Sequence, residues 1–187
     1  MSNLPPKNTS FFNKINTLLM NLYSQKQNEV FRFSILDSIK STINQNKNII
    51  TIANGGSSAI ASHFTTDLVK NLNARALFLS DHGLLTCLSN DYGYDQAAVE
   101  YIKRFSTHGD TVILISSSGK SQNIINAAKF CTLEKISCFG LGGFGATSSL
   151  SKLLQPGNSL QINSENYNVI ELMHLAVLLD IVEDLLP

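Results

Sequence analysis

The chain has 187 residues, of which 43% are hydrophobic, a size and composition that suit one folded domain with a core and exclude a disordered chain. Lys and Arg total 14 and Asp and Glu total 14, so the formal charge is zero, which excludes the basic surface typical of nucleic-acid-binding proteins. Charged residues make up only 15%, against about 25% in typical domains, which indicates either burial of surface in an oligomer or an ordinary surface rich in Ser and Asn.

Two segments near the N-terminus, after a lead-in over residues 1–8, carry apolar residues at helical spacing. In FFNKINTLLMNLYSQ these residues are Phe11, Ile15, Leu18, Leu19 and Leu22. In VFRFSILDSIKSTI they are Phe31, Ile35, Ile39 and Ile43. Both predicted helices precede any strand, so they either cap the domain or pair with another subunit.

From Asn48 onward, short apolar runs alternate with segments of helical spacing. We predict strands over residues 49–53, 76–80, 111–116, 136–141 and 159–163, with a Gly-rich loop after the fourth. We expect helices over residues 57–70, 83–89, 94–105, 121–133 and 167–185. The strands lack a clean alternation of polar and apolar residues, which is typical of strands buried on both faces. The sequence therefore predicts an α/β fold with a parallel sheet between two layers of helices.

The three cysteines, Cys87, Cys131 and Cys138, form no C-x-x-C pair, and their odd number argues against a disulfide framework or a structural zinc site. We expect free, mostly buried thiols. The N-terminus lacks the pattern of a signal peptide, and no apolar run approaches the length of a transmembrane helix. These features predict a cytoplasmic protein that binds neither membrane nor nucleic acid.

Two loops rich in Gly and Ser each follow a predicted strand and open a predicted helix. The first is Asn54-Gly55-Gly56-Ser57-Ser58, and the second, SSSGKSQN, covers residues 116–123. Parallel sheets bind ligands at the carboxyl ends of their strands, and the first N–H groups of a helix attract anions. Glycines allow close approach of the backbone, and serine hydroxyls add donors. The loops therefore predict a phosphate site, with Lys120 either adding charge or facing solvent.

Neither loop has the G-x-x-x-x-G-K-[ST] pattern of a P-loop or the G-x-G-x-x-G pattern of a dinucleotide fold. The structural alternative is that Gly and Ser only cap helices, with Ser57 and Ser121 as N-caps. Two such loops on one edge of the same sheet favour the ligand site.

Three motifs in chain order resemble the phosphoheptose isomerases of the sugar isomerase (SIS) family. They are ANGGSSAIASHFTTDLV (53–69), SNDYGYDQA (89–97) and ISSSGKSQNIINAAKF (115–130), and the similarity runs from about residue 30 to the C-terminus. Members of that family convert sedoheptulose 7-phosphate to a heptose 7-phosphate for lipopolysaccharide assembly. The resemblance implies a three-layer α/β/α sandwich of the flavodoxin-like type with a five-stranded parallel sheet. It divides the chain into an N-terminal helical segment, 1–46, and an SIS domain, 47–187. It also implies a homotetramer, or a dimer, with active sites at subunit interfaces.

The resemblance assigns binding roles residue by residue. The phosphate-binding residues would be Ser116, Ser117, Ser118 and Ser121. The residues that contact phosphate or sugar would be Asn54, Gly55, Gly56 and Ser57. Asp91 would contact a sugar hydroxyl.

The catalytic residues match the family only in part. The isomerase reaction needs a general base and an acid, for which the family uses a first-helix glutamate and a last-helix histidine. Asp67 takes the glutamate position with a side chain one methylene shorter, while the histidine position falls on Leu178 or Leu179 in two possible registers. We therefore expect Asp67 as the base and His174 or Glu171 as the second group. The alternative is that His174 and Glu171 serve a subunit interface.

Some family members bind zinc through these positions. Here His63 lies four residues before Asp67, on the same helix face. The glutamine ligand falls on Ile170 or Glu171, so the four-ligand set looks incomplete and we expect no required cofactor, with zinc held by His63 and Asp67 as the open alternative. His63 could instead pack or hydrogen-bond at the edge of the core.

Two functions follow from these residues. The first is an aldose–ketose isomerase acting on sedoheptulose 7-phosphate or a similar sugar phosphate, favoured by the carboxylate at Asp67. The second is a non-catalytic SIS tetramer that senses a phosphosugar or binds a protein such as a replication initiator, favoured by the missing histidine. We prefer the isomerase.

Overall fold

Five parallel strands form one sheet in the order β2-β1-β3-β4-β5. The computed structural model describes residues 10–186. The strands are β1 (Asn48–Ala53), β2 (Arg75–Phe78), β3 (Thr111–Ile115), β4 (Ser137–Gly143) and β5 (Ser159–Ile162). Each predicted strand is present, and the central strand β3 is buried along its whole length. Burial on both faces explains why the strand sequences lack polar alternation.

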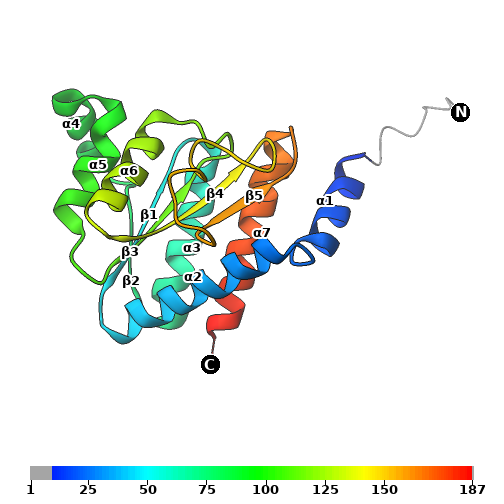
Figure 1. The fold of residues 1–187 in the computed structure, drawn as a ribbon. Coiled ribbons are helices and arrows are strands. Elements are labelled where there is room, and N and C mark those ends of the chain that lie inside the picture. The colour runs from blue at the N-terminus through cyan, green and yellow to red at the C-terminus, as the bar shows by residue number, and fades with distance from the viewer. Residues whose placement is uncertain (1–9, 187) are drawn as a thin grey trace, which may run out of the picture.

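The described residues form seven helices, and all but the first flank the two faces of the sheet (Figure 1). The helices are α1 (Ser10–Asn21), α2 (Lys26–Asn44), α3 (Gly56–Leu72), α4 (His82–Tyr92), α5 (Tyr94–Phe105), α6 (Gln122–Leu133) and α7 (Tyr167–Leu185). Helix α1 packs on α7. One core cluster joins the sheet to α2, α3 and α7, and a second joins it to α4, α5 and α6. Neighbouring strand residues enter opposite clusters, as Ile49 and Ile50 do, because strand side chains alternate between faces. The predicted three-layer α/β/α fold is confirmed.

Two strand boundaries differ from the prediction. Strand β4 continues through Gly142 and Gly143, which we expected in a loop, because these glycines pair with Gln161 and Ile162 of β5. A Cβ atom on Gly143 would lie 2.6 Å from Ile170 Cδ1, so the glycine allows α7 to pack closely on the sheet. Strand β2 ends at Phe78, two residues before the predicted end, since it is an edge strand whose pairing with β1 stops there.

The two N-terminal helices pack on the same face as α7. Helix α2 buries Phe31 and Ile35 completely in the first core cluster. Arg32 Nε lies 3.1 Å from Asp180 Oδ2 of α7, and the Tyr23 hydroxyl donates to the same oxygen at 2.8 Å. Helix α1 projects from the body of the molecule in Figure 1. Residues 1–9 of the predicted N-terminal segment lie outside the described residues, and contact with a partner subunit stays a prediction.

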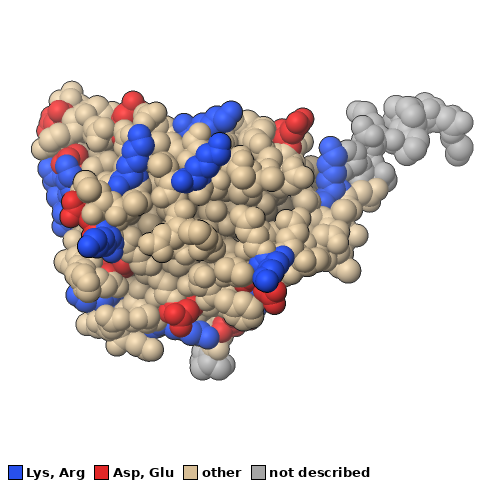
Figure 2. Space-filling model, in the orientation of Figure 1, with Lys and Arg blue, Asp and Glu red and all other residues tan. Residues whose placement is uncertain are grey.

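The surface carries scattered charges, in agreement with the balanced composition, and the cysteines form no disulfides. Figure 2 shows one face of the molecule, on which Lys, Arg, Asp and Glu stand scattered over a mostly uncharged surface. All three cysteines are free, with Cys87 exposed and Cys131 and Cys138 buried. Among the described helices, none combines the length and apolar character needed to cross a membrane.

Candidate functional site

The two predicted loops meet at one cavity of about 250 Å³. Its lining residues are Asn54, Gly55, Gly56, Ser57, Ile115, Ser116, Ser117, Ser118, Ser121, Tyr167 and Glu171. The loops follow β1 and β3, the neighbouring strands at which the strand order reverses. This reversal is the switch point at which flavodoxin-like sheets bind ligands. The structure thus brings together all of the loop residues that the sequence assigned to phosphate binding.

Glycines shape the first loop. Gly55 is the N-cap of α3 with a φ of 54°, in the left-handed region that favours glycine. Gly56 begins the helix, and a Cβ atom there would lie 2.7 Å from Glu171 Oε2. Only a residue without a side chain leaves room for the Glu171 carboxylate at this point. The first turn of α3 is therefore open to a ligand and to Glu171.

The second loop folds back on itself before α6. The N–H of Gly119, whose φ is 60°, donates to the carbonyl of Ser116 at 2.9 Å. The backbone N–H of Lys120 donates to Ser118 Oγ at 3.2 Å. Lys120 itself is exposed and is not among the residues that line the cavity. The turn therefore directs serines toward the cavity and the lysine toward solvent.

The serine hydroxyls connect the loop residues and do not cap the helices. Ser57 lies inside the first turn of α3, so its prediction as an N-cap is wrong, because Gly55 takes that position. Ser121 is the N-cap of α6, but its side chain makes no capping hydrogen bond. Ser57 Oγ lies 3.4 Å from Ser117 Oγ, and Ser116 Oγ donates to Ser121 Oγ at 3.2 Å. The helix-capping alternative therefore does not account for these hydroxyls.

Glu171 is the only charged residue among the described residues that line the cavity. Lys, Arg and His are absent from the residues that line it. The N-termini of α3 and α6 both open at its edge, and each carries unpaired N–H groups and partial positive charge. A phosphate group would therefore be held by backbone dipoles and hydroxyl donors.

A side-chain network ties Asn54 to two other elements. Asn54 Nδ2 donates to Asn123 Oδ1 at 2.8 Å, and Asn123 Nδ2 donates back to Asn54 Oδ1 at 2.9 Å. The Tyr94 hydroxyl donates to the same Asn54 Oδ1 at 2.8 Å. Asn123 and Tyr94 lie within the quoted motifs, but the sequence did not reveal their roles. These bonds join all three motifs at one residue.

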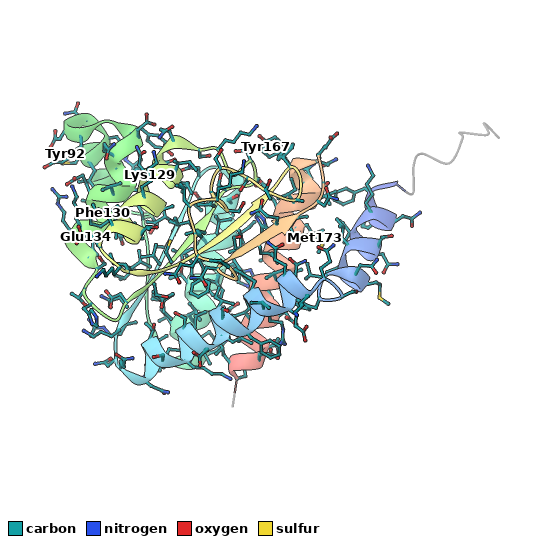
Figure 3. All side chains as sticks on the ribbon, viewed as in Figure 1. Tyr92, Lys129, Phe130, Glu134, Tyr167 and Met173 are labelled. Carbon is teal, nitrogen blue, oxygen red and sulfur yellow. The ribbon has the colours of Figure 1, made fainter. Side chains whose placement is uncertain are left out.

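Tyr167 is a further lining residue that sequence reasoning missed. It is the first residue of α7, and Figure 3 labels it. The centroid of its ring lies 4.7 Å from the centroid of the Phe144 ring. It precedes Glu171 by four residues, so both lie on the same helix face. That spacing, together with its place after the fifth strand, is the signal that could have identified it.

Asp91 lies on α4, outside the cavity lining. Its exposed carboxylate is 3.7 Å from Cys87 Sγ and 3.0 Å from Asn90 Nδ2. The motif 89–97 reaches the site through Tyr94. A contact between Asp91 and a sugar hydroxyl stays a prediction.

Asp67 and His63 form a pair well away from the cavity. His63 Nε2 lies 3.3 Å from Asp67 Oδ2, with 51% and 19% of the two side chains exposed. Asp67 follows Gly56 by eleven residues on α3, which is about 16 Å at 1.5 Å per residue. Within one chain, the proposed base is therefore remote from the two Gly/Ser loops.

His174 points into the core and not into the cavity. Its side chain is completely buried, and its Nε2 donates to the Gly142 carbonyl at 3.0 Å. Its Nδ1 has no hydrogen-bond partner among the described residues. Burial lowers the pKa of His174 to about 4, although the bond to Gly142 opposes this shift. Leu178 is likewise completely buried, so Glu171 is the candidate group of α7 that reaches the cavity.

The residues do not fit a four-ligand zinc site within one chain. Among residues 10–186, no three His, Cys, Asp or Glu side chains come together in a way that could hold a metal ion. His63 and Asp67 supply two groups, whereas zinc sites use three or four protein ligands.

Comparisons with known proteins agree with the fold and identify the family. The SIS domain profile matches residues 10–142. A probable phosphoheptose isomerase of Thermoplasma acidophilum is 31% identical over 151 residues, which cover 77% of this chain and 81% of that protein. A phosphoheptose isomerase of Cytophaga hutchinsonii is 34% identical over 110 residues, or 56% of each chain. The structure of a phosphoheptose isomerase from Neisseria gonorrhoeae superposes with a TM-score of 0.84 at 21% identity, covering 93% of this chain and 94% of that one. The chain therefore belongs to the SIS domain family.

Proposed function

We propose that the protein is an aldose–ketose isomerase that acts on sedoheptulose 7-phosphate or a similar sugar phosphate. The observation that carries this proposal is the cavity at the switch point, lined by the two Gly/Ser loops and the carboxylate of Glu171. The two relatives described above, whose names give them as phosphoheptose isomerases and which align with 77% and 56% of the chain, support the same reaction.

Phosphate binding is the first step. The substrate phosphate lies between the N-termini of α3 and α6, where Ser118 and Ser121 donate hydroxyl hydrogen bonds. The cavity has no basic side chain in its lining, so the site selects a phosphate by geometry and dipoles more than by net charge. The sugar extends from the cavity past Tyr167 and Glu171.

The chemical step moves a proton between two adjacent carbons through an enediol. A general base removes the proton from the carbon beside the carbonyl, and a second group exchanges protons with the carbonyl and hydroxyl oxygens. We assign the base to Asp67. We assign the second role to Glu171, because it lines the cavity while His174 is sealed in the core.

The role that we assign to Asp67 requires a second copy of the chain, because Asp67 is remote from the loops of its own chain. Asp67 lies about 16 Å along α3 from Gly56, so a second copy of the chain would bring its own Asp67 to the cavity. Exposed apolar side chains on the helices offer surface for such contacts, among them Phe12, Met20, Phe33 and Leu172. We therefore propose a homotetramer, or a dimer, with composite active sites.

The activity fits the cytoplasm. The three cysteines of the chain are free thiols, which are typical of proteins in a reducing compartment.

Proton NMR of the purified protein with sedoheptulose 7-phosphate, with and without zinc, tests the proposal. New aldose anomeric signals would support it, and we expect both Asp67→Asn and Glu171→Gln to abolish them. Glu165→Gln, at an exposed position near the start of α7, is the matched control and should retain activity. Substrate line-broadening without new signals would indicate a binding protein without turnover. No interconversion of any C5–C7 sugar phosphate would refute the isomerase.

A further inference from the structure

We infer that Asn123 and Tyr94 are positioning residues that hold Asn54 as a pure hydrogen-bond donor toward the ligand and tie the two phosphate loops together. The ligand-facing part of this inference rests on the proposed function. Neither residue lines the cavity, so both act through Asn54.

The hydrogen bonds of Asn54 leave one group free. An asparagine side chain has one oxygen with two acceptor sites and one NH₂ with two donors. Tyr94 and Asn123 both donate to Asn54 Oδ1, at 2.8 and 2.9 Å, which occupies both acceptor sites. One donor of Asn54 Nδ2 goes to Asn123 Oδ1 at 2.8 Å. The second N–H of Nδ2 is then the only hydrogen-bonding group that the Asn54 side chain can offer to the cavity.

This arrangement selects the chemistry of the ligand at that position. A free amide side chain can rotate to present either its oxygen or its nitrogen. Here a flip of the Asn54 amide alone would place its Oδ1 against Asn123 Oδ1 and its Nδ2 against Asn123 Nδ2. Both hydrogen bonds of the pair would be lost. The ligand atom that faces Asn54 must therefore accept a hydrogen bond, as an oxygen of a phosphate or a carbonyl group does.

The amide pair also continues the connection between β1 and β3 beyond the sheet. The last paired residues of these strands are Ala53 and Ile115, and Asn54 is the next residue along β1. Asn123 lies in the first turn of α6, at the end of the second loop, and is only 5% exposed. The two loops are thus joined by a partly buried side-chain pair at the point where backbone pairing stops.

Tyr94 adds a contact from a third element. It opens α5, and half of its surface is exposed, so its ring adds little to the core. The bond from its hydroxyl to Asn54 is therefore the main interaction that Tyr94→Phe would remove. This variant tests the orientation of Asn54 without disturbing the packing.

The experiment compares two variants with matched controls. Tyr94→Phe is paired with Tyr92→Phe, since Tyr92 lies on α4, where Figure 3 labels it, and its hydroxyl accepts from Arg104. Asn123→Ala is paired with Asn126→Ala, one turn later on α6, where Asn126 Nδ2 donates to the Asp95 carbonyl.

The first readout needs no ligand. In hydrogen exchange of the free protein, Asn123→Ala should raise the exchange rates of amides in both loops, 54–58 and 116–123, by about tenfold. Asn126→Ala should leave both loops unchanged. Exchange in Asn123→Ala equal to that in Asn126→Ala would overturn the coupling of the loops, whatever the protein binds.

The second readout is the kinetics with sedoheptulose 7-phosphate. Tyr94→Phe should raise KM about fivefold, the size expected for one neutral hydrogen bond, with kcat and melting temperature close to wild type. Asn123→Ala should raise KM about tenfold or more. If the wild-type enzyme is active and the two variants Tyr94→Phe and Tyr92→Phe have equal KM values, the inferred orientation of Asn54 is wrong. The proposed function would then stand. A wild-type protein that neither binds nor converts the substrate would refute the proposed function and the donor role together.

Discussion

The carboxylate of Glu171 lies against Gly56 in the first turn of α3, where a Cβ atom would come within 2.7 Å of Glu171 Oε2. This contact joins α7 to the first Gly/Ser loop, which covers residues 54–58. It brings an acid to the N-terminus of a helix, where the macrodipole stabilises negative charge. Because Gly56 has no side chain, the carboxylate of Glu171, a proposed catalytic group, can lie against the first turn of α3.

Gly56→Ala should therefore disturb the site more than the fold. Alanine suits the helical backbone at this position, but its methyl group would push the flexible end of Glu171 away. We expect a melting temperature near wild type and a loss of isomerase activity of at least about tenfold, because a displacement near 1 Å can be that costly. Gly83→Ala in the first turn of α4, where the nearest atom is 3.4 Å away, should keep full activity. Equal activity in both variants would contradict the role of Glu171.

The phosphate site should depend on its hydroxyls and not on its neighbouring lysine. The double variant Ser118→Ala/Ser121→Ala should weaken binding of sedoheptulose 7-phosphate by about tenfold or more, because each lost neutral hydrogen bond is worth roughly 1 kcal/mol. Lys120→Ala should change the affinity by less than about threefold, since Lys120 is exposed and outside the lining. Calorimetric titration measures both, with the exposed Ser149→Ala as control. Unchanged affinity in the double variant would argue against any ligand role for the loops.

His174 should make the folded state sensitive to acid. Its pKa is lowered to about 4 by burial, while the unfolded chain has an ordinary value of about 6.5. Between these values the unfolded state binds more protons, so the free energy of unfolding decreases as the pH falls from about 6.5 toward 4. We expect a loss of about 2 kcal/mol between pH 7 and pH 5 from this residue.

Urea denaturation at several pH values measures this effect. His174→Leu should remove that part of the pH dependence, whereas His82→Gln, at an exposed position, should keep it. The same slope in His174→Leu and in wild type would show that another group is responsible.

Asp180 should anchor the N-terminal helices to α7. It receives hydrogen bonds from Arg32 and Tyr23, and burial together with the Asp180 carboxylate raises the pKa of the Tyr23 hydroxyl. Asp180→Ala leaves both donors without this partner and should lower the free energy of unfolding by about 1–3 kcal/mol. Glu183→Ala, exposed on the same helix, should have little effect in the same denaturation experiment. A comparable loss in both variants would mean that the anchor adds nothing specific.

The sequence by itself determined the layers and the loops of this protein. Helical spacing and apolar runs are local properties, so they predicted every strand and helix of the sheet domain to within a few residues. The Gly/Ser loops were predictable for the same reason. The residues that end a strand and leave the first turn of the next helix accessible are neighbours in the chain. Local chemistry predicted the loop 116–123 as an anion site, and the family resemblance singled out serines 116, 117, 118 and 121, which line the cavity.

The tertiary structure alone decided which side of α7 serves the site. Glu171 and His174 are three residues apart, and periodicity placed them on nearly the same face. The close approach of Ile170 to Gly143 sets the rotation of α7 on the sheet, which sends His174 to the Gly142 carbonyl and Glu171 to the cavity. The contacts of Asn54 with Tyr94 and Asn123 likewise join residues 40 and 69 positions apart. Periodicity tells which residues share a face, but only packing between distant segments decides what that face meets.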